Sequence, residues 1–158
     1  MSHRQPTISD RRDLLQHLVR RQYRHGQVSR SYIRRLSNDL DVGSAEIGGV
    51  VDFYSFLSRT PRGRFDIRVS DNIVDRMSGS RELAAALAAH LGIEPGQSSP
   101  NASLDYTSCT GMSDQGPAIL VNGHAIPAVT AARAERIAAL VDAATDLNRW
   151  PSDWFEVR

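Results

Sequence analysis

The sequence predicts an α/β protein: a helical N-terminal part, residues 1–62, followed by a small mixed sheet flanked by helices, residues 63–148. Two observations support this. Apolar residues recur every three or four positions up to about Ser58, and from Arg64 the pattern changes to strands that alternate with a helical segment. The 158 residues, 41% of them hydrophobic, are enough to bury a core. An aromatic segment, residues 149–158, follows.

Two apolar stripes predict helices between about Asp10 and Ser58. The first consists of Leu14, Leu15, Leu18 and Val19, and the second of Ile47, Val50, Val51, Tyr54 and Leu57. We expect Ser44 to cap the second helix, with Glu46 in the first turn, where the helix dipole favours a negative charge. Pro61 and Gly63 then end the helical part.

The remaining elements follow from a change of period. Alternation of Phe65, Ile67 and Val69 with polar residues predicts a strand, and residues 80–91 predict a helix ended by Gly92. After a turn-rich connector, residues 97–103, we expect strands at 104–108 and 118–121 and a return strand at 124–129. Asn122 and Gly123 suit the tight turn between the last two. A final helix from about Thr130 is predicted to bury Ile137, Leu140, Val141, Ala144 and Leu147.

The aromatic segment contains Trp150, Trp154 and Phe155 without a regular period. Three aromatic side chains are rarely left in water. Two arrangements satisfy them: the segment folds back on the core, or it reaches into a partner.

Composition excludes several classes of protein. A single cysteine, Cys109, rules out an internal disulfide framework and a zinc site built on paired cysteines. No apolar run approaches the ~20 residues that span a bilayer, and the N-terminal residues lack the apolar core of a signal peptide, so we expect a cytoplasmic protein without membrane insertion. Residues 1–40 hold nine arginines against three aspartates, which indicates a solvated face or a dock for an acidic partner. No basic-aromatic motif accompanies them, so no nucleic acid is expected.

Two stretches, Phe65–Asp75 and Leu104–Gly123, carry the most informative motifs, together with Asp52–Leu57 and Pro61–Arg64. In this order they resemble the thioredoxin-like [2Fe-2S] subunit of the NADH-oxidising module of respiratory complex I. They are more similar still to its relatives in NAD-reducing hydrogenases and NAD-dependent formate dehydrogenases. The resemblance implies a thioredoxin-like, ferredoxin-type domain over residues 63–148.

The resemblance also places the four cluster ligands of the family, all cysteines, at Ser70, Asp75, Cys109 and Ser113. Three of the four therefore carry oxygen in place of sulfur. Soft thiolates suit iron, whereas serine hydroxyls hardly ionise and aspartate is a hard ligand. We expect these positions to hold no cofactor, with the oxygen side chains bonded to backbone groups or to one another.

The expected partner is the FMN- and NAD-binding flavoprotein of the same complex, with this chain as a non-catalytic, docking part of the oxidoreductase. In the family the cluster lies beside the main electron path, so its loss would spare that path. Two alternatives stay open: a [2Fe-2S] electron carrier with mixed Cys, Asp and Ser ligation, in which Cys109 is the only thiol ligand, and a thiol redox protein that uses Cys109.

Overall fold

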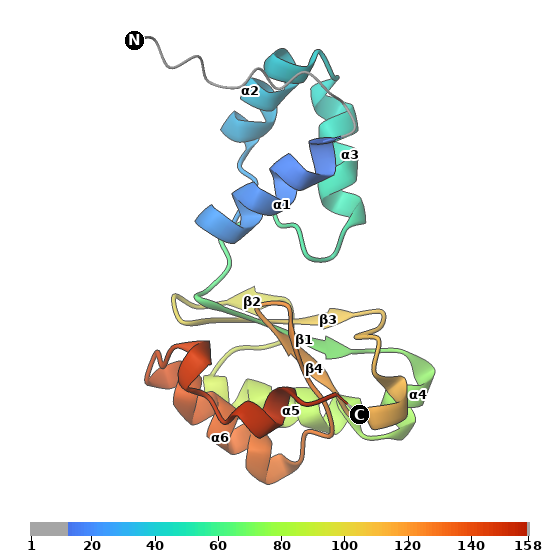
Figure 1. Ribbon diagram of the computed structural model, residues 1–158, viewed down its shortest axis with the longest axis vertical. Coiled ribbons are helices and arrows are strands. Elements are labelled where there is room, and N and C mark those ends of the chain that lie inside the picture. Colours follow the sequence, from blue (N-terminus) through green and yellow to red (C-terminus); the bar gives the residue numbers. More distant parts are fainter. Residues whose placement is uncertain (1–12, 158) are drawn as a thin grey trace. The chain divides into compact units, whose positions relative to one another are not determined.

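The computed structural model describes residues 13–157, which divide after Pro61 into two compact units. The predicted helical start near Asp10 and the N-terminal residues 1–6, for which no signal peptide is predicted, lie outside the described residues. The α/β class is confirmed, because the first unit is helical and the second contains a five-stranded mixed sheet with helices (Figure 1). Across residues 13–157 no helix combines the length and apolarity needed to cross a membrane.

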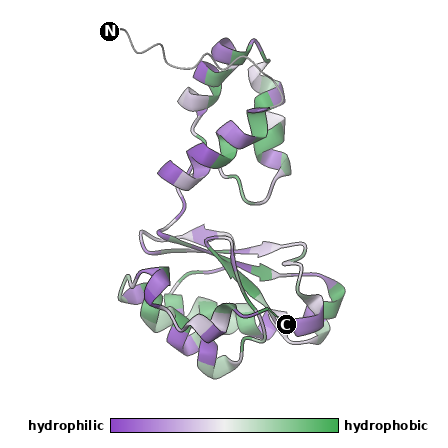
Figure 2. Cartoon of the chain, in the orientation of Figure 1, coloured by the Kyte–Doolittle hydropathy of each residue, from purple (hydrophilic) through white to green (hydrophobic). Residues whose placement is uncertain are grey.

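The first unit consists of three helices, α1 (Leu14–His25), α2 (Arg30–Leu40) and α3 (Ser44–Phe53). Figure 2 shows hydrophobic colouring concentrated on α3, whereas α1 and α2 carry many hydrophilic residues. The sequence prediction missed α2 as a separate helix, because its apolar side chains are spaced singly among polar ones. Its buried residues nevertheless share one face: Ile33, Leu36 and Leu40. Together with Leu18, Ile47 and Val51 they form the core of this unit.

Three details of the helical prediction are wrong. Ser44 is the first residue of α3, not its cap; Gly43 holds the cap position and no side chain bonds the first turn. The helix ends at Phe53, so Tyr54 and Leu57 lie beyond it, although Leu57 is buried. Val19 is 40% exposed while Leu18 is fully buried. Successive helical residues point about 100° apart, so only one of this adjacent pair faces the core.

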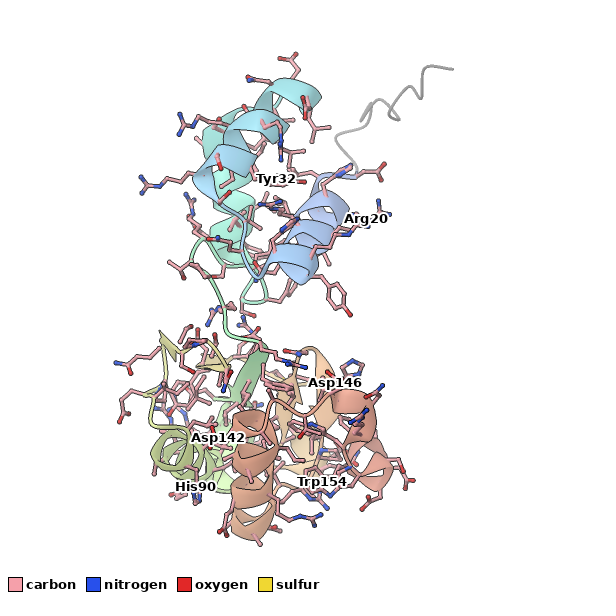
Figure 3. All side chains as sticks on the ribbon, turned by 90° about the vertical axis from the view of Figure 1, so that its left-hand side faces the viewer. Arg20, Tyr32, His90, Asp142, Asp146 and Trp154 are labelled. Atoms are coloured by element: carbon pink, nitrogen blue, oxygen red, sulfur yellow. The ribbon has the colours of Figure 1, made fainter. Side chains whose placement is uncertain are left out.

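The basic side chains of the first unit lie on its surface. Arg20, Arg24 and Arg34 are exposed. Two further guanidinium groups flank the ring of Tyr32, with Arg21 at 4.9 Å and Arg35 at 5.4 Å from its centroid. Figure 3 labels Arg20 and Tyr32. The described part of this unit therefore exposes several positively charged side chains.

The sheet of the second unit has the strand order β2-β3-β1-β4-β5. The strands are β1 (Phe65–Ser70), β2 (Gln97–Ser98), β3 (Ala102–Thr107), β4 (Ile119–Val121) and β5 (His124–Ile126). Central strand β1 runs parallel to β3 and antiparallel to β4. Helices α5 (Ser80–Leu91) and α6 (Ala131–Asp142) lie together on one face of the sheet (Figure 1). The buried side chains Phe65, Ile67 and Val69 join the residues of these helices in one core.

Several strand and helix boundaries differ from the prediction. β3 begins at Ala102, and β2 lies inside the predicted connector. β5 ends at Ile126, because Pro127 has no backbone N–H to continue a ladder. The last helix ends at Asp142, and Ala144, at φ 50°, turns the chain out of the helix. Leu147 follows in a short 3-10 helix, η3 (Leu147–Arg149), where it packs partly buried against the core.

Other local predictions are confirmed. Asn122 and Gly123 both have positive φ, 50° and 82°, as the tight turn between β4 and β5 requires. Gly92 ends α5 in the left-handed conformation. The last helix, predicted from about Thr130, begins at Ala131, and Thr130 is its cap: the Thr130 hydroxyl accepts a hydrogen bond from the backbone N–H of Arg133 at 3.2 Å.

The aromatic segment folds back on the second unit. Trp150 and Trp154, the latter in a 3-10 helix, η4 (Ser152–Phe155), are only 4% and 3% exposed. The Trp150 ring lies 5.7 Å from that of Phe65, and its Nε1–H donates to the carbonyl of Thr145 at 3.0 Å. Trp154, labelled in Figure 3, lies beside α6 under the guanidinium group of Arg136 at 4.9 Å. Of the two arrangements that the sequence left open, the structure has the first.

Candidate functional site

The four family ligand positions lie at or shortly after the C-terminal ends of two neighbouring strands, β1 and β3. Ser70 is the last residue of β1, and Asp75 lies five residues on in α4 (Ile73–Met77). Cys109 follows β3 by two residues, and Ser113 opens the 3-10 helix η2 (Ser113–Gln115). Because β1 and β3 are parallel, with Ser70 opposite Thr107, their C-terminal ends lie side by side at the same end of the sheet. The two motif-bearing loops therefore meet.

At this end of the sheet the oxygen side chains bond to one another. The carboxylate oxygen Oδ2 of Asp75 accepts hydrogen bonds from the hydroxyl of Ser70 at 2.6 Å and the hydroxyl of Ser113 at 3.1 Å. Cys109 joins only loosely: its Sγ lies 3.8 Å from Ser113 Oγ and accepts a bond from the N–H of Gly111 at 3.2 Å. The structure thus brings all four predicted positions together in one cluster, in which Asp75 Oδ2 accepts hydrogen bonds from both serines.

A fifth residue, Asn72, completes the cluster, and sequence reasoning missed it. Its Nδ2 donates to Asp75 Oδ2 at 2.6 Å and lies 2.9 Å from Ser113 Oγ and 3.1 Å from Ser70 Oγ. Its Oδ1 accepts from the backbone N–H of Asp75 at 2.9 Å, which caps α4. The signal was present in the sequence, since Asn three residues before a first-turn acidic residue is typical of a helix start.

The inner part of the cluster is closed to solvent. Ser70 and Asp75 are both 0% exposed, whereas Cys109 is exposed. The backbone of Gly116 packs closely against the Asp75 carboxylate: a Cβ at that position would lie 2.6 Å from Asp75 Oδ1. That Oδ1 atom is buried without a hydrogen-bond partner in the described part of the chain.

Ion pairs of Asp71 with two arginines stabilise the segment between β1 and α4, which carries Asn72. Asp71 accepts two bonds from Arg76, both at 2.8 Å, and a further bond from Arg81 at 2.8 Å. The hydrogen bond from Arg76 and the charge of Arg76, followed by the hydrogen bond and the charge of Arg81, hold the pKa of the Asp71 carboxyl below its usual value. Arg81 also lies over the ring of Tyr106 at 4.5 Å. The segment from β1 into α4 is thereby tied to α5 and β3.

The donor set does not fit a [2Fe-2S] cluster. Such a cluster takes four ligands, normally thiolates, and this site offers one thiol, one carboxylate and two hydroxyls. The one carboxylate oxygen that faces the other donors already accepts three hydrogen bonds. Within residues 13–157, no group of three or more His, Cys, Asp and Glu side chains is placed to hold a metal ion. The arrangement suits a self-bonded polar core.

Comparisons with known proteins agree with the motifs. The family model "Thioredoxin-like [2Fe-2S] ferredoxin" matches residues 1–142. A subunit of the NADH-quinone oxidoreductase of Escherichia coli (strain K12) is 33% identical over 103 residues, covering 64% of this chain and 62% of that protein. NADH-quinone oxidoreductase subunit 2 of Thermus thermophilus is 30% identical over 133 residues, covering 82% of this chain and 74% of that protein.

Similarity to hydrogenases extends to the fold. The NAD-reducing hydrogenase HoxS subunit alpha of Cupriavidus necator is 29% identical over 116 residues, which cover 72% of this chain and 19% of that protein. A crystal structure of NAD+-reducing [NiFe]-hydrogenase in the H2-reduced state superposes with a TM-score of 0.80 at 32% identity. The match covers 92% of this chain and 25% of that chain. The chain thus spans less than two thirds of the length of the Escherichia coli protein and about a quarter of the hydrogenase chain.

Proposed function

Since this chain belongs to the thioredoxin-like [2Fe-2S] ferredoxin family, we propose that it is a cluster-free docking part of a cytoplasmic NADH-oxidising or NAD-reducing diaphorase module. One observation carries the proposal. Two residues at the family's ligand positions, Ser70 and Ser113, donate hydrogen bonds to a third, Asp75 Oδ2, so these polar side chains have partners that do not require a metal. In this proposal the chain keeps the fold of an electron carrier but no cluster, and its role is to bind the other part of the module during assembly.

The partner in this proposal is the FMN- and NAD-binding flavoprotein of the same complex. The similar hydrogenase chain is about four times as long as its matched part, so there the same fold is continuous with a larger polypeptide. On this chain, α4 presents three apolar side chains beside the cluster: Ile73, Val74 and Met77 are 69%, 49% and 84% exposed. A group of exposed apolar side chains on one short helix is typical of a contact surface.

The two alternatives lack comparable support. A mixed-ligand [2Fe-2S] carrier is favoured by the convergence of Cys109, Asp75 and the two serines, but it would have to break three hydrogen bonds to one carboxylate oxygen. A thiol redox protein is favoured by the exposure of Cys109. No second cysteine exists to resolve an oxidised thiol, and position 113, beside it, carries a serine.

Co-expression tests the docking role. We expect the tagged chain to co-purify with its flavoprotein and the double variant Ile73→Asp/Met77→Asp to lose at least about tenfold in affinity, since a charge buried in an apolar contact costs well over 1.4 kcal/mol. Val157→Asp is the matched control, because Val157 is an apolar side chain, 56% exposed, that is not part of α4. A monomeric wild-type chain that binds no flavoprotein would contradict the proposal.

A further inference from the structure

The polar cluster at the end of β1 has an unusual centre, the side-chain amide of Asn72. Its Nδ2 atom lies 2.6 Å from Asp75 Oδ2, 2.9 Å from Ser113 Oγ and 3.1 Å from Ser70 Oγ. Three oxygen atoms from three different elements thus converge on one nitrogen. Oxygen donors arranged around a common point are the usual surroundings of a hard cation.

The orientation of this amide is fixed by its other end. The backbone N–H of Asp75 can only donate, so the atom 2.9 Å from it must be the amide oxygen. Asp75 Oδ2 accepts hydrogen bonds from the hydroxyls of Ser70 and Ser113, and the NH2 group, a donor, is the end of the amide that faces it. Both ends of the side chain therefore require the same orientation.

The hydroxyl groups have complementary roles. Ser70 and Ser113 each donate a hydrogen to Asp75 Oδ2, which leaves their lone pairs free for the hydrogens of the amide. The NH2 group has two hydrogens for three acceptors, so at least one of them is shared. Ser70 and Asp75 are fully buried while Asn72 is in place, so loss of the amide donor would remove a hydrogen bond from acceptors that have no contact with solvent in the intact site.

We propose that the amide of Asn72 substitutes for a cation at this site: its NH2 group supplies, from within the chain, the positive pole that holds the three oxygen atoms together and thereby closes the site to metal ions. This inference rests on the proposed cluster-free function and names the residue that maintains it. Asn72 is accordingly a positioning residue for the edge where β1 and β3 end.

Replacing one atom tests the proposal. Asn72→Asp keeps the capping oxygen but exchanges the NH2 group for a second carboxylate oxygen beside Asp75. We expect its melting temperature in EDTA to fall by roughly 5–10 °C relative to wild type. Two carboxylates and two hydroxyls suit a hard divalent ion, so manganese should restore much of the loss and give a bound Mn²⁺ signal in electron paramagnetic resonance. Wild type and Asn148→Asp, at an exposed asparagine, should not respond.

Asn72→Ser separates the donor from the cap, since serine also caps helices but lacks the NH2 group. We expect this variant to have a lower melting temperature than wild type, and we expect manganese to leave that temperature unchanged. The inference is overturned if Asn72→Asp melts like wild type in EDTA, if manganese fails to stabilise or fold it, or if Asn72→Ser is as stable as wild type. Iron and acid-labile sulfide in the wild-type chain would instead remove the proposed function itself.

Discussion

Restoring the missing thiols is expected to give this chain a cluster. In the variant Ser70→Cys/Asn72→Ser/Asp75→Cys/Ser113→Cys, all four family positions carry sulfur and the central amide is gone. We expect anaerobic reconstitution to load about two irons and two sulfides per chain, with the visible absorption of a [2Fe-2S] centre. The reason is geometric: the strand ends, α4 and η2 already bring these positions together around one point.

Two controls sharpen this experiment. Adding Cys109→Ser leaves three thiols and should lower the iron content markedly. The variant Ser70→Cys/Asp75→Cys/Ser113→Cys, which keeps both Cys109 and Asn72, should also bind less iron, because the amide of Asn72 still lies between the ligand positions. If the four-cysteine variant folds, as judged by circular dichroism, and still binds no more iron than wild type, the backbone does not retain the family's ligand geometry, and ligand replacement alone would not explain the site.

Replacing the buried Trp154 of the aromatic segment by alanine is expected to have the largest effect on stability. Trp154 is 3% exposed and packs on Trp150, with ring centroids 6.2 Å apart, and under Arg133 and Arg136. Trp154→Ala should cost about 3–5 kcal/mol, because it removes a large buried side chain and leaves a cavity. For a chain of this length the melting temperature should fall by roughly 10 °C or more.

Val157→Ala is the matched control for this variant. Val157 lies in the same segment but is 56% exposed, so its truncation should change stability by no more than about 0.5 kcal/mol. Thermal unfolding followed by circular dichroism compares the two. Equal melting temperatures for Trp154→Ala and wild type would mean that the segment does not contribute to the core of the second unit.

Regular periodicity is what made much of the fold predictable. β1 alternates strictly at Phe65, Ile67 and Val69, and α5 lies between a clear apolar stripe and Gly92, so both were located from sequence. The helix α2 was missed because its few apolar residues stand among charged ones. α4 was missed because it has only five residues, and its apolar side chains face outward.

The site was predictable in part for a different reason. Motif order placed Ser70, Asp75, Cys109 and Ser113 at the family's ligand positions, and these do come together. Asn72 could not be identified this way, because the family pattern gives its position no ligand role. Only the three-dimensional convergence of Ser70, Asp75 and Ser113 reveals what its amide does. Cap residues of this kind become informative once their side-chain partners are known.

Chemical analysis of the wild-type chain tests the central claim most directly. Anaerobically purified protein, assayed for iron, acid-labile sulfide and visible absorption, is predicted to be colourless and to contain far less than one iron per chain. The opposite result, close to two irons and two sulfides per chain that disappear in Cys109→Ser, would contradict the account.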